Sequence, residues 1–216
     1  MNKNLIFILF LSFIVNSCKN QVQSEAVVYN NTFESNNLSG IKDGIVTQYN
    51  NTSVLGQYNN GGFSLNLNDL PRHHLITIAF DLYIHDSWDG NKLSPDGPDI
   101  WQMLVDNNTY IDASFSNGAC AIGPGIICPP QSYPLNYPNN YSYPKKGAFK
   151  TDLPGVCHLI NNPTGTTMYH IEKTFKHSNN ILVLQCLDKL VQTNTTDPKC
   201  DESWSVDNII IKAITL

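Results

Sequence analysis

The chain has 216 residues, of which 41% are hydrophobic and only 14% are charged. This composition excludes an intrinsically disordered chain, because disordered segments combine low hydrophobicity with high net charge. The formal net charge of −5 excludes the basic surface that nucleic-acid binding requires, so we expect no nucleic-acid partner.

The first 17 residues have the pattern of a signal peptide. Lys3 precedes an apolar run from Leu5 to Val15 that only Ser12 interrupts, and small or tolerated residues for cleavage follow it. The run of about 11 residues is shorter than the roughly 20 residues of a membrane span. We find no second run of this length, so we expect a secreted or extracellular protein without an integral membrane segment.

Cys18 leaves a second interpretation open. Residues 15–18 read VNSC, which resembles a bacterial lipobox, so Cys18 could carry a lipid anchor at the cell surface. Two features favour soluble secretion: frequent N-glycosylation sequons, and a cysteine count that is even only if Cys18 is not lipidated. The sequons begin at Asn30, Asn37, Asn50, Asn51, Asn107, Asn140 and Asn194.

Cysteines of an exported chain usually form disulfides. Cys120 and Cys128 bracket a Gly/Pro-containing loop, and Cys186 and Cys200 bracket the segment before the last expected strand. We therefore predict a Cys120–Cys128 and a Cys186–Cys200 disulfide, and leave Cys157 unassigned. No cysteine spacing matches a zinc site.

Alternation of apolar and polar residues, which is the period of a half-buried strand, recurs along the chain. Asp106-Asn107-Asn108 predicts a hairpin turn between two of these strands, and no segment shows a clear helical period. The expected strands are 27–29, 63–67, 75–84, 100–105, 110–111, 168–172, 181–186 and 206–214.

Residues 117–165 break this pattern. They hold eight of the twelve prolines, together with many Gly, Asn and Tyr residues, so neither a helix nor an interior strand can run through them. We expect a long Pro/Gly/Tyr-rich loop excursion on an all-β, antiparallel sandwich. The expected organisation is a signal peptide at 1–17, a short N-terminal segment at 18–26 and a single β-sandwich domain at 27–216.

Three motifs carry a resemblance to a known module. Residues 80–91 read FDLYIHDSWDGN, residues 97–101 read GPDIW and residues 201–209 read DESWSVDNI. This set, which extends over most of 30–214, resembles an extracellular β-sandwich module of secreted bacterial and some eukaryotic proteins. The last motif is also similar to the final strand of MAM domains, reelin repeats and carbohydrate-binding jelly rolls.

The resemblance implies a jelly-roll sandwich with an extracellular binding or adhesion role. In these relatives an acidic residue near the first strand and an Asp near the last strand hold a structural calcium, which implies Glu34 and Asp207 here. The alternative is that these carboxylates accept backbone or Trp N–H hydrogen bonds. The chain departs from the module at His85, where an apolar residue is usual, and at the cysteine-bearing stretch 118–130, which looks inserted.

A second calcium site is predicted between two expected strands. Oxygen-bearing side chains are closely spaced on a Gly-containing loop there, and calcium takes six to eight oxygen ligands. The alternative is that Asp and Asn form turns by capping their own backbone. The candidate ligands are Asp86, Asp89, Asn91, Asp96 and Asp99.

Aromatic side chains are candidates for stacking on sugars. Trp88 lies on the acidic loop, so we expect it to be exposed, whereas Trp101 and Trp204 are expected in the core. Tyr133, together with the other tyrosines of the excursion, is a second candidate contact. The alternative is that these tyrosines hold the excursion onto the sandwich.

No catalytic residues are predicted. The chain lacks Gly-x-Ser-x-Gly and phosphate-binding glycine loops, and no spacing pairs two carboxylates as a glycosidase requires. The sequence therefore favours a non-catalytic extracellular binding or adhesion module for a glycan or a cell-surface protein, with a structural Ca²⁺. A glycan-active enzyme on the same fold and a structural coat or matrix protein remain as alternatives, because fold alone does not separate them.

Overall fold

The computed structural model describes residues 21–118, 129–193 and 195–216. The predicted signal peptide at 1–17, the lipid-anchor candidate Cys18, the Cys120–Cys128 pair and the sequon at Asn194 lie outside these residues. In the described residues no helix is both long and apolar enough to cross a membrane.

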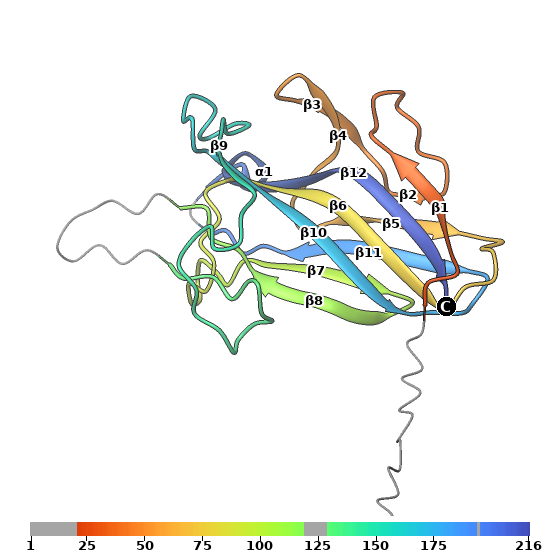
Figure 1. Ribbon diagram of the computed structural model, residues 1–216. Helices are drawn as coiled ribbons and strands as arrows, with labels where there is room; N and C mark the ends of the chain where they lie inside the picture. Colours follow the sequence, from red (N-terminus) through yellow and green to blue (C-terminus); the bar gives the residue numbers. More distant parts are fainter. Residues whose placement is uncertain (1–20, 119–128, 194) are drawn as a thin grey trace, which may run out of the picture.

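Two antiparallel sheets form the molecule (Figure 1). In the first sheet the order is β3 (Val46–Tyr49), β4 (Thr52–Tyr58), β12 (Glu202–Thr215), β6 (Leu75–Asp86), β10 (Thr166–Lys176) and β9 (Lys150–Leu153), and β1 (Ser24–Asn31) also pairs with β12. In the second sheet the order is β2 (Ile41–Lys42), β5 (Gly62–Leu67), β11 (Leu182–Lys189), β7 (Ile100–Val105) and β8 (Asn108–Ser114). A short helix, α1 (Pro198–Asp201), precedes β12.

The strand order is that of a jelly roll. Strands β4-β12-β6-β10 of the first sheet face β5-β11-β7-β8 of the second, so the chain crosses between sheets at most connections and forms the eight-stranded double Greek key. The expected all-β class and jelly-roll sandwich are therefore confirmed. The first strand begins at Ser24, upstream of the expected domain start at residue 27.

Alternation along the strands produces the core. In β6 the side chains of Ile76, Ile78, Phe80 and Leu82 are buried, while the residues between them are partly exposed. Trp101 of the second sheet meets Trp204 of the first sheet edge to face, with ring centroids 5.8 Å apart. One hydrophobic cluster draws on both sheets, because each sheet has one apolar face to bury.

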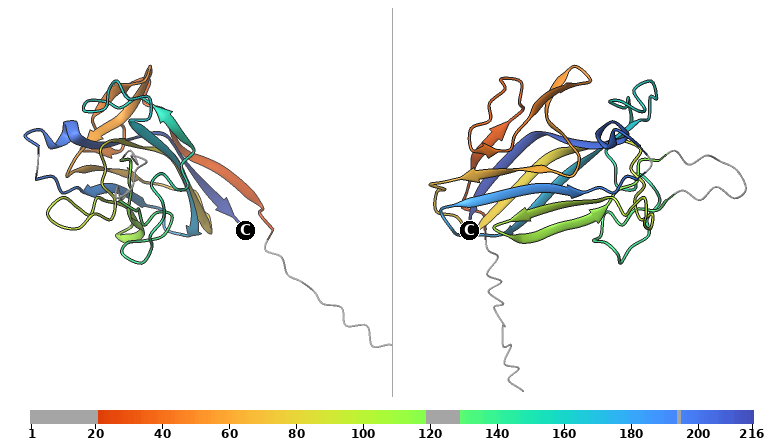
Figure 2. Two further views of the ribbon diagram at one scale, coloured as in Figure 1. Left: turned by 90° about the vertical axis from the view of Figure 1, so that its left-hand side faces the viewer. Right: turned by 180° about the vertical axis from the view of Figure 1, so that it is seen from behind.

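Loops gather at one end of the sandwich, which we call the loop end (Figures 1 and 2). The C-terminus and the turns at the other ends of the same strands lie at the opposite end (Figure 1). The described part of the 117–165 excursion has little regular structure, as expected: it contains only β9 and an isolated bridge between Gln131 and Ser142. The loop end comprises residues 87–99, 115–118, 129–149, 154–165, 190–193 and 195–201.

The predicted Cys186–Cys200 disulfide is wrong. Cys200 is bonded to Cys157, which ties the 154–165 segment to α1. Cys186 is a buried free thiol on β11, and burial raises its pKa well above the usual value. The error arose because Cys186 points into the core from the middle of a strand, where its alternation partners Leu182 and Leu184 are also buried.

Candidate functional site

Trp88 is fully buried, contrary to the expectation that it is an exposed sugar-stacking residue. Its indole N–H donates to the carbonyl oxygen of Ser203 at 2.9 Å. Its ring meets Phe115 edge to face at 6.4 Å. Trp88 thus fixes the start of the acidic loop to β12 and closes the core at the loop end. Trp101 and Trp204 are buried as expected.

Tyr133 is half-buried and holds the excursion onto the sandwich. Its ring stacks on Phe115, with centroids 4.7 Å apart and an interplanar angle of 26°, and meets Tyr169 at 5.2 Å. Burial raises the pKa of Tyr133. These contacts match the alternative interpretation of the tyrosines, in which they pin the loop.

Other aromatic side chains of the excursion are exposed. Tyr141, Tyr143 and Phe149 are 76%, 88% and 68% accessible to solvent. Their backbone is nevertheless held in place: the Phe149 N–H donates to Met168 O at 2.8 Å. The Ser142 N–H, between the two tyrosines, donates to Gln131 O at 2.7 Å. Tyr141 and Tyr143 are among the tyrosines that the sequence predicts, with Tyr133, as ligand contacts. Phe149 was not predicted, because it is a single aromatic residue in a mostly polar segment.

Gln131 holds the backbone of the excursion in place through several hydrogen bonds. It is fully buried, and its side-chain oxygen accepts the Lys145 N–H at 2.9 Å and the Tyr169 hydroxyl at 3.1 Å. Its side-chain nitrogen donates to Lys146 O at 3.0 Å. The excursion therefore has a fixed path although it lacks regular strands.

Two members of the acidic loop have structural partners. The buried Asp86 carboxylate accepts the backbone N–H of Leu159 at 2.9 Å and of Val156 at 3.3 Å. Burial raises the pKa of Asp86, although these hydrogen bonds oppose the rise. The Asn91 side chain donates to Asn140 O at 2.9 Å and so binds the loop to the excursion. Asp86 and Asn91 thus act as loop caps, in line with the turn interpretation.

Asp89 and Asp99 lie together in the structure. The Asp89 N–H donates to Asp99 Oδ2, and the Asp89 carboxylate pairs with Lys92 Nζ at 2.7 Å. Lys92 also approaches Asp96 at 3.4 Å, so Asp96 belongs to the same ion-pair group. Asp99 is fully buried, and burial raises its pKa to about 8.

Glu202, which the sequence did not single out, joins Asp99 at the loop end. Glu202 is fully buried, and burial, followed by the charges of Asp99 and Asp89, raises its pKa to about 10. The side-chain nitrogen of Gln192 donates to Glu202 Oε1. The signal for Glu202 was present in the DESW motif, but only the fold brings that motif next to the acidic loop.

A pocket of about 460 Å³ opens beside these carboxyl groups. Its wall includes Asp89 and Gln192, both of which contact the buried pair. The pocket therefore leads from solvent towards Asp99 and Glu202. Its lining residues are Ser87, Asp89, His158, Gln192, Thr195 and Asp201.

Glu34 and Asp207, implied by the resemblance, also meet. The Thr52 hydroxyl lies 2.5 Å from Glu34 Oε1 and 3.4 Å from Asp207 Oδ2. The hydrogen bond from Thr52 lowers the pKa of Glu34. Burial raises the pKa of Asp207 to about 6, and Asp81 and Glu34 add to that rise.

No group of three or more His, Cys, Asp or Glu side chains is arranged as a metal cluster within residues 21–118, 129–193 and 195–216. A calcium ion does not require such a group, because backbone carbonyls, side-chain amides and water complete its oxygen shell. Both carboxylate pairs are therefore compatible with calcium on donor chemistry.

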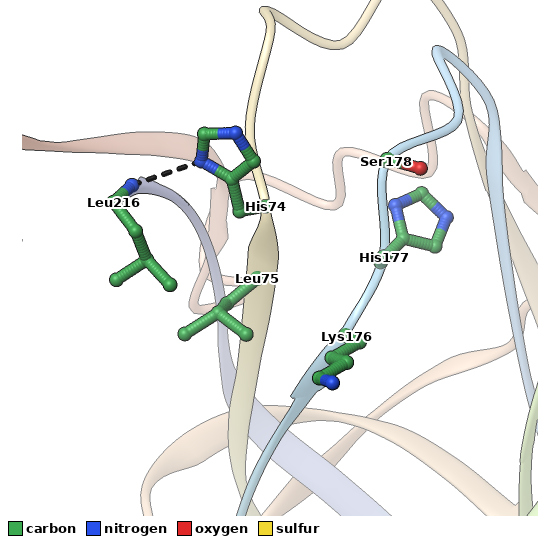
Figure 3. Close-up of a pocket in the computed structure, with 6 residues that line it drawn as sticks. All are labelled: His74, Leu75, Lys176, His177, Ser178 and Leu216. Atoms are coloured by element: carbon green, nitrogen blue, oxygen red, sulfur yellow. Dashed lines mark hydrogen bonds between the residues drawn. The ribbon is translucent and has the colours of Figure 1, made fainter. Parts of the chain in front are cut away.

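A pocket of about 550 Å³ lies at the opposite end of the sandwich (Figure 3). Leu75 begins β6 and His74 precedes it, whereas Lys176 ends β10 and His177 and Ser178 follow it. The Leu216 N–H donates to His74 Nδ1 at 2.9 Å. The ring nitrogens of His177 are already bonded to His73 at 2.6 Å and to Asp106 at 3.0 Å. The residues lining this pocket offer neither a Trp, Tyr or Phe ring nor a side-chain carboxylate.

The described sequons differ in their surroundings. Asn30, Asn37, Asn50, Asn51 and Asn107 are exposed. Asn140 is half-buried, and its side-chain nitrogen donates to Ser132 O at 2.7 Å and to Ser142 Oγ at 3.0 Å. Because glycosylation uses this same nitrogen, the folded structure favours the five exposed positions over Asn140.

The fold defines the class as an antiparallel jelly-roll sandwich with an elaborated loop end. No family model matches the chain, and no curated protein matches it. Among solved structures, a family 35 carbohydrate binding module from Clostridium thermocellum is similar, with 11% identity, coverage of 87% of this chain and 97% of that chain, and a TM-score of 0.37. Dimeric latent PorU from Porphyromonas gingivalis is similar with 8% identity and a TM-score of 0.37, and the match covers 70% of this chain and 10% of that chain. The fold assignment rests on the strand order of this chain.

Proposed function

We propose that this protein is a non-catalytic extracellular binding module that recognises a glycan at its loop end. The observation that carries the proposal is the set of exposed aromatic side chains, Tyr141, Tyr143 and Phe149, on a backbone fixed to the sandwich. Aromatic rings offer a flat apolar face with large contact area, which suits the apolar faces of sugar rings.

The fixed backbone supports this proposal energetically. A binding loop that is already ordered loses less conformational entropy when it binds its ligand. Gln131 and Tyr133 supply this order from beneath the loop. Lys146 and Lys150 are exposed on the same segment and can donate hydrogen bonds to sugar hydroxyl or carboxylate groups.

We further propose a structural calcium between Glu34 and Asp207. Glu34 follows β1, whereas Asp207 lies in β12, and Thr52 of β4 contacts both carboxylates. A calcium ion there would join the segment after β1 to the central strand. Burial raises the pKa of Asp207, and repulsion from Asp81 and Glu34 adds to the rise; a calcium ion would offset that repulsion.

Export to the cell exterior belongs to the same proposal. The N-terminal leader pattern, the Cys157–Cys200 disulfide and the exposed sequons support it, because disulfides persist in oxidising compartments. Free secretion and a lipid anchor at Cys18 predict different products. Mass spectrometry of the mature N-terminus distinguishes an unmodified chain from an acylated cysteine.

The test of glycan recognition is an array of neutral and uronic-acid-containing glycans, followed by calorimetric titration of any ligand found. Tyr143→Ala is expected to weaken binding about 30-fold if Tyr143 is a central contact. Ile181→Ala is the matched control, because Ile181 is 48% exposed beside β11 at the opposite end. Silence across the array, or equal loss in both variants, contradicts the proposal. Release of reducing sugar from polysaccharides would instead favour the enzyme alternative.

A further inference from the structure

Two fully buried carboxyl groups, those of Asp99 and Glu202, lie beneath the loop end. Their hydrogen-bond partners, Asp89 and Gln192, line the same pocket. Asp99 immediately precedes β7 in the second sheet, and Glu202 is the first residue of β12 in the first sheet. The pair therefore bridges the two sheets where the loops begin. This pair is separate from Glu34 and Asp207, since Asp207 lies five residues further along β12.

Each carboxyl group has one oxygen bonded and one oxygen without a partner. Asp99 Oδ2 accepts the Asp89 N–H, and Glu202 Oε1 accepts a hydrogen from the Gln192 side chain. Asp99 Oδ1, Glu202 Oε2 and the side-chain oxygen Oε1 of Gln192 are buried and have no hydrogen-bond partner among the described residues. The N–H groups of Gly90 and Val191 oppose the rise in the Asp99 pKa but make no hydrogen bond to Oδ1.

Unpartnered buried oxygens are rare, because each loses its hydration without recovering a bond. Buried carboxyl groups in proteins are therefore protonated, paired with a cation or bound to a metal. The described ion pairs supply no cation to Asp99 or Glu202, since Lys92 Nζ is directed to Asp89 and Asp96. Asp99, Gln192 and Glu202 thus each have a buried acceptor oxygen with no donor among the described residues.

We propose that Asp99, Glu202 and Gln192 bind a calcium ion through these oxygens, with water from the adjoining 460 Å³ pocket completing the shell. The donors are all oxygens, which favours a hard cation over zinc or copper. Calcium accepts the mixed carboxylate, amide and water set more readily than magnesium, which demands near-ideal octahedral geometry.

The ion would connect three segments that are distant in sequence. Asp99 ends the acidic loop, Gln192 follows β11, and Glu202 starts β12 next to the Cys157–Cys200 disulfide. The acidic loop is in turn bonded to the excursion through Asn91 and Asn140. Calcium at this position would therefore stabilise the whole loop end. The proposal does not depend on which ligand the loop end recognises.

The first measurement is thermal unfolding of the full mature protein in chelator and in calcium. A calcium concentration of about ten times Kd should raise the Tm by about 3–6 °C. The Glu202→Gln and Asp99→Asn variants should lose the part of this shift that belongs to the proposed site. The Asp207→Asn variant should lose only the shift from the Glu34–Asp207 site. Asp152→Asn, a change at an exposed position of β9, should leave both shifts unchanged.

The second measurement needs no variant of the site and uses terbium as a luminescent probe. Trp88 adjoins Asp89 in sequence, and its indole bonds to Ser203 O beside Glu202, so excitation of Trp88 should sensitise terbium bound there. Calcium should displace the terbium and abolish the emission. Trp88→Phe should reduce the emission without changing the calcium-dependent Tm shift.

Three results would overturn the proposed site. The first is a wild-type protein whose Tm does not respond to calcium or chelator. The second is a Glu202→Gln or Asp99→Asn variant that folds and binds calcium with wild-type stoichiometry by calorimetry. The third is terbium emission that calcium does not displace. A wild-type protein that binds calcium but no glycan would instead contradict the proposed function and leave the cation site supported.

Discussion

His85 is a fully buried titratable residue in β6. Its Nδ1 lies 2.9 Å from the Thr166 hydroxyl, and its Nε2 lies 2.7 Å from the Ser205 hydroxyl. Each hydroxyl can either donate or accept a hydrogen bond, so both ring nitrogens of a neutral His85 have a hydrogen-bond partner. Complete burial lowers the pKa of His85 from 6.5 to about 3.

This lowered pKa predicts acid sensitivity. Between pH 6.5 and about 3 the unfolded chain binds a proton at His85 that the folded chain does not. Stability is therefore lost as the pH falls through this window and is fully present above it. At pH 4.5 we expect His85 alone to reduce the free energy of unfolding by about 2–3 kcal/mol relative to pH 7.5. Urea unfolding at the two pH values measures this difference.

The variant that isolates this effect is His85→Gln, which keeps a polar side chain but cannot be protonated. Its loss of stability between pH 7.5 and pH 4.5 should be smaller than that of the wild type by about the same amount. His158→Gln is the control, because His158 is exposed. An equal pH dependence in the wild type and His85→Gln would contradict the prediction.

At the scale of elements, close strand pairing decides which residues are permitted. Gly62 of β5 pairs with Leu187 of β11. A Cβ atom at Gly62 would lie 2.0 Å from Cys186 O and 2.8 Å from Leu187 Cα. Both contacts are with backbone, which cannot rotate away as a side chain can. A Cβ at the neighbouring Gly61 would lie 3.9 Å from its nearest contact, Asn59 O.

We therefore expect Gly62→Ala to lower the free energy of unfolding by about 2–3 kcal/mol, because the two strands must separate to admit the methyl group. Gly61→Ala should change it by less than about 0.5 kcal/mol. Urea unfolding of both variants at pH 7.5 makes the comparison. Equal effects of the two substitutions would show that the β5–β11 register differs from the one described.

The hairpins show where local sequence was informative and where it was overlooked. Asp106 and Asn107 both have positive φ between β7 and β8, and their turn was predicted from sequence. Asn50 and Asn51 have the same conformation between β3 and β4, but that hairpin was not predicted. Strand β4 is buried at four consecutive residues, so it lacks the alternation on which strand prediction depends.

At the scale of the whole molecule, one core joins the two sheets and the loop end. The three tryptophans are fully buried: Trp88 belongs to the loop end, Trp101 to the second sheet and Trp204 to the first. All belong to one hydrophobic cluster. Their fluorescence therefore reports on three parts of the structure at once.

We expect the sandwich and the loop end to unfold in a single cooperative transition, because the main hydrophobic cluster includes residues of both sheets and of the loop end. Tryptophan fluorescence and far-ultraviolet circular dichroism should give the same urea midpoint. Acrylamide should quench the native protein weakly, since each indole is shielded from solvent. An earlier fluorescence transition, together with a native tryptophan that acrylamide readily quenches, would indicate that Trp88 is exposed.

The sequence by itself determined the all-β class, the approximate positions of most strands and the scarcity of regular structure in the Pro-rich excursion. These properties follow from residue periodicity and from the backbone limits of Pro, Gly and Asn, which act within a few residues. The jelly-roll expectation came from the resemblance of motifs such as 80–91 and 201–209, whose residues form the paired strands β6 and β12.

Only the tertiary structure decided the burial of Trp88, the Cys157–Cys200 disulfide and the burial of both Asp99 and Glu202 at the loop end. Each depends on which distant segments the strand order brings to the same end of the sandwich. Trp88 looked like a loop residue, yet β12 lies against it through Ser203. The acidic loop likewise looked like a self-contained site, but its buried carboxyl group, Asp99, lies beside one that the sequence places about 100 residues away. Long-range contacts of this kind leave no local periodicity, so the candidate cation site became visible only in the folded chain.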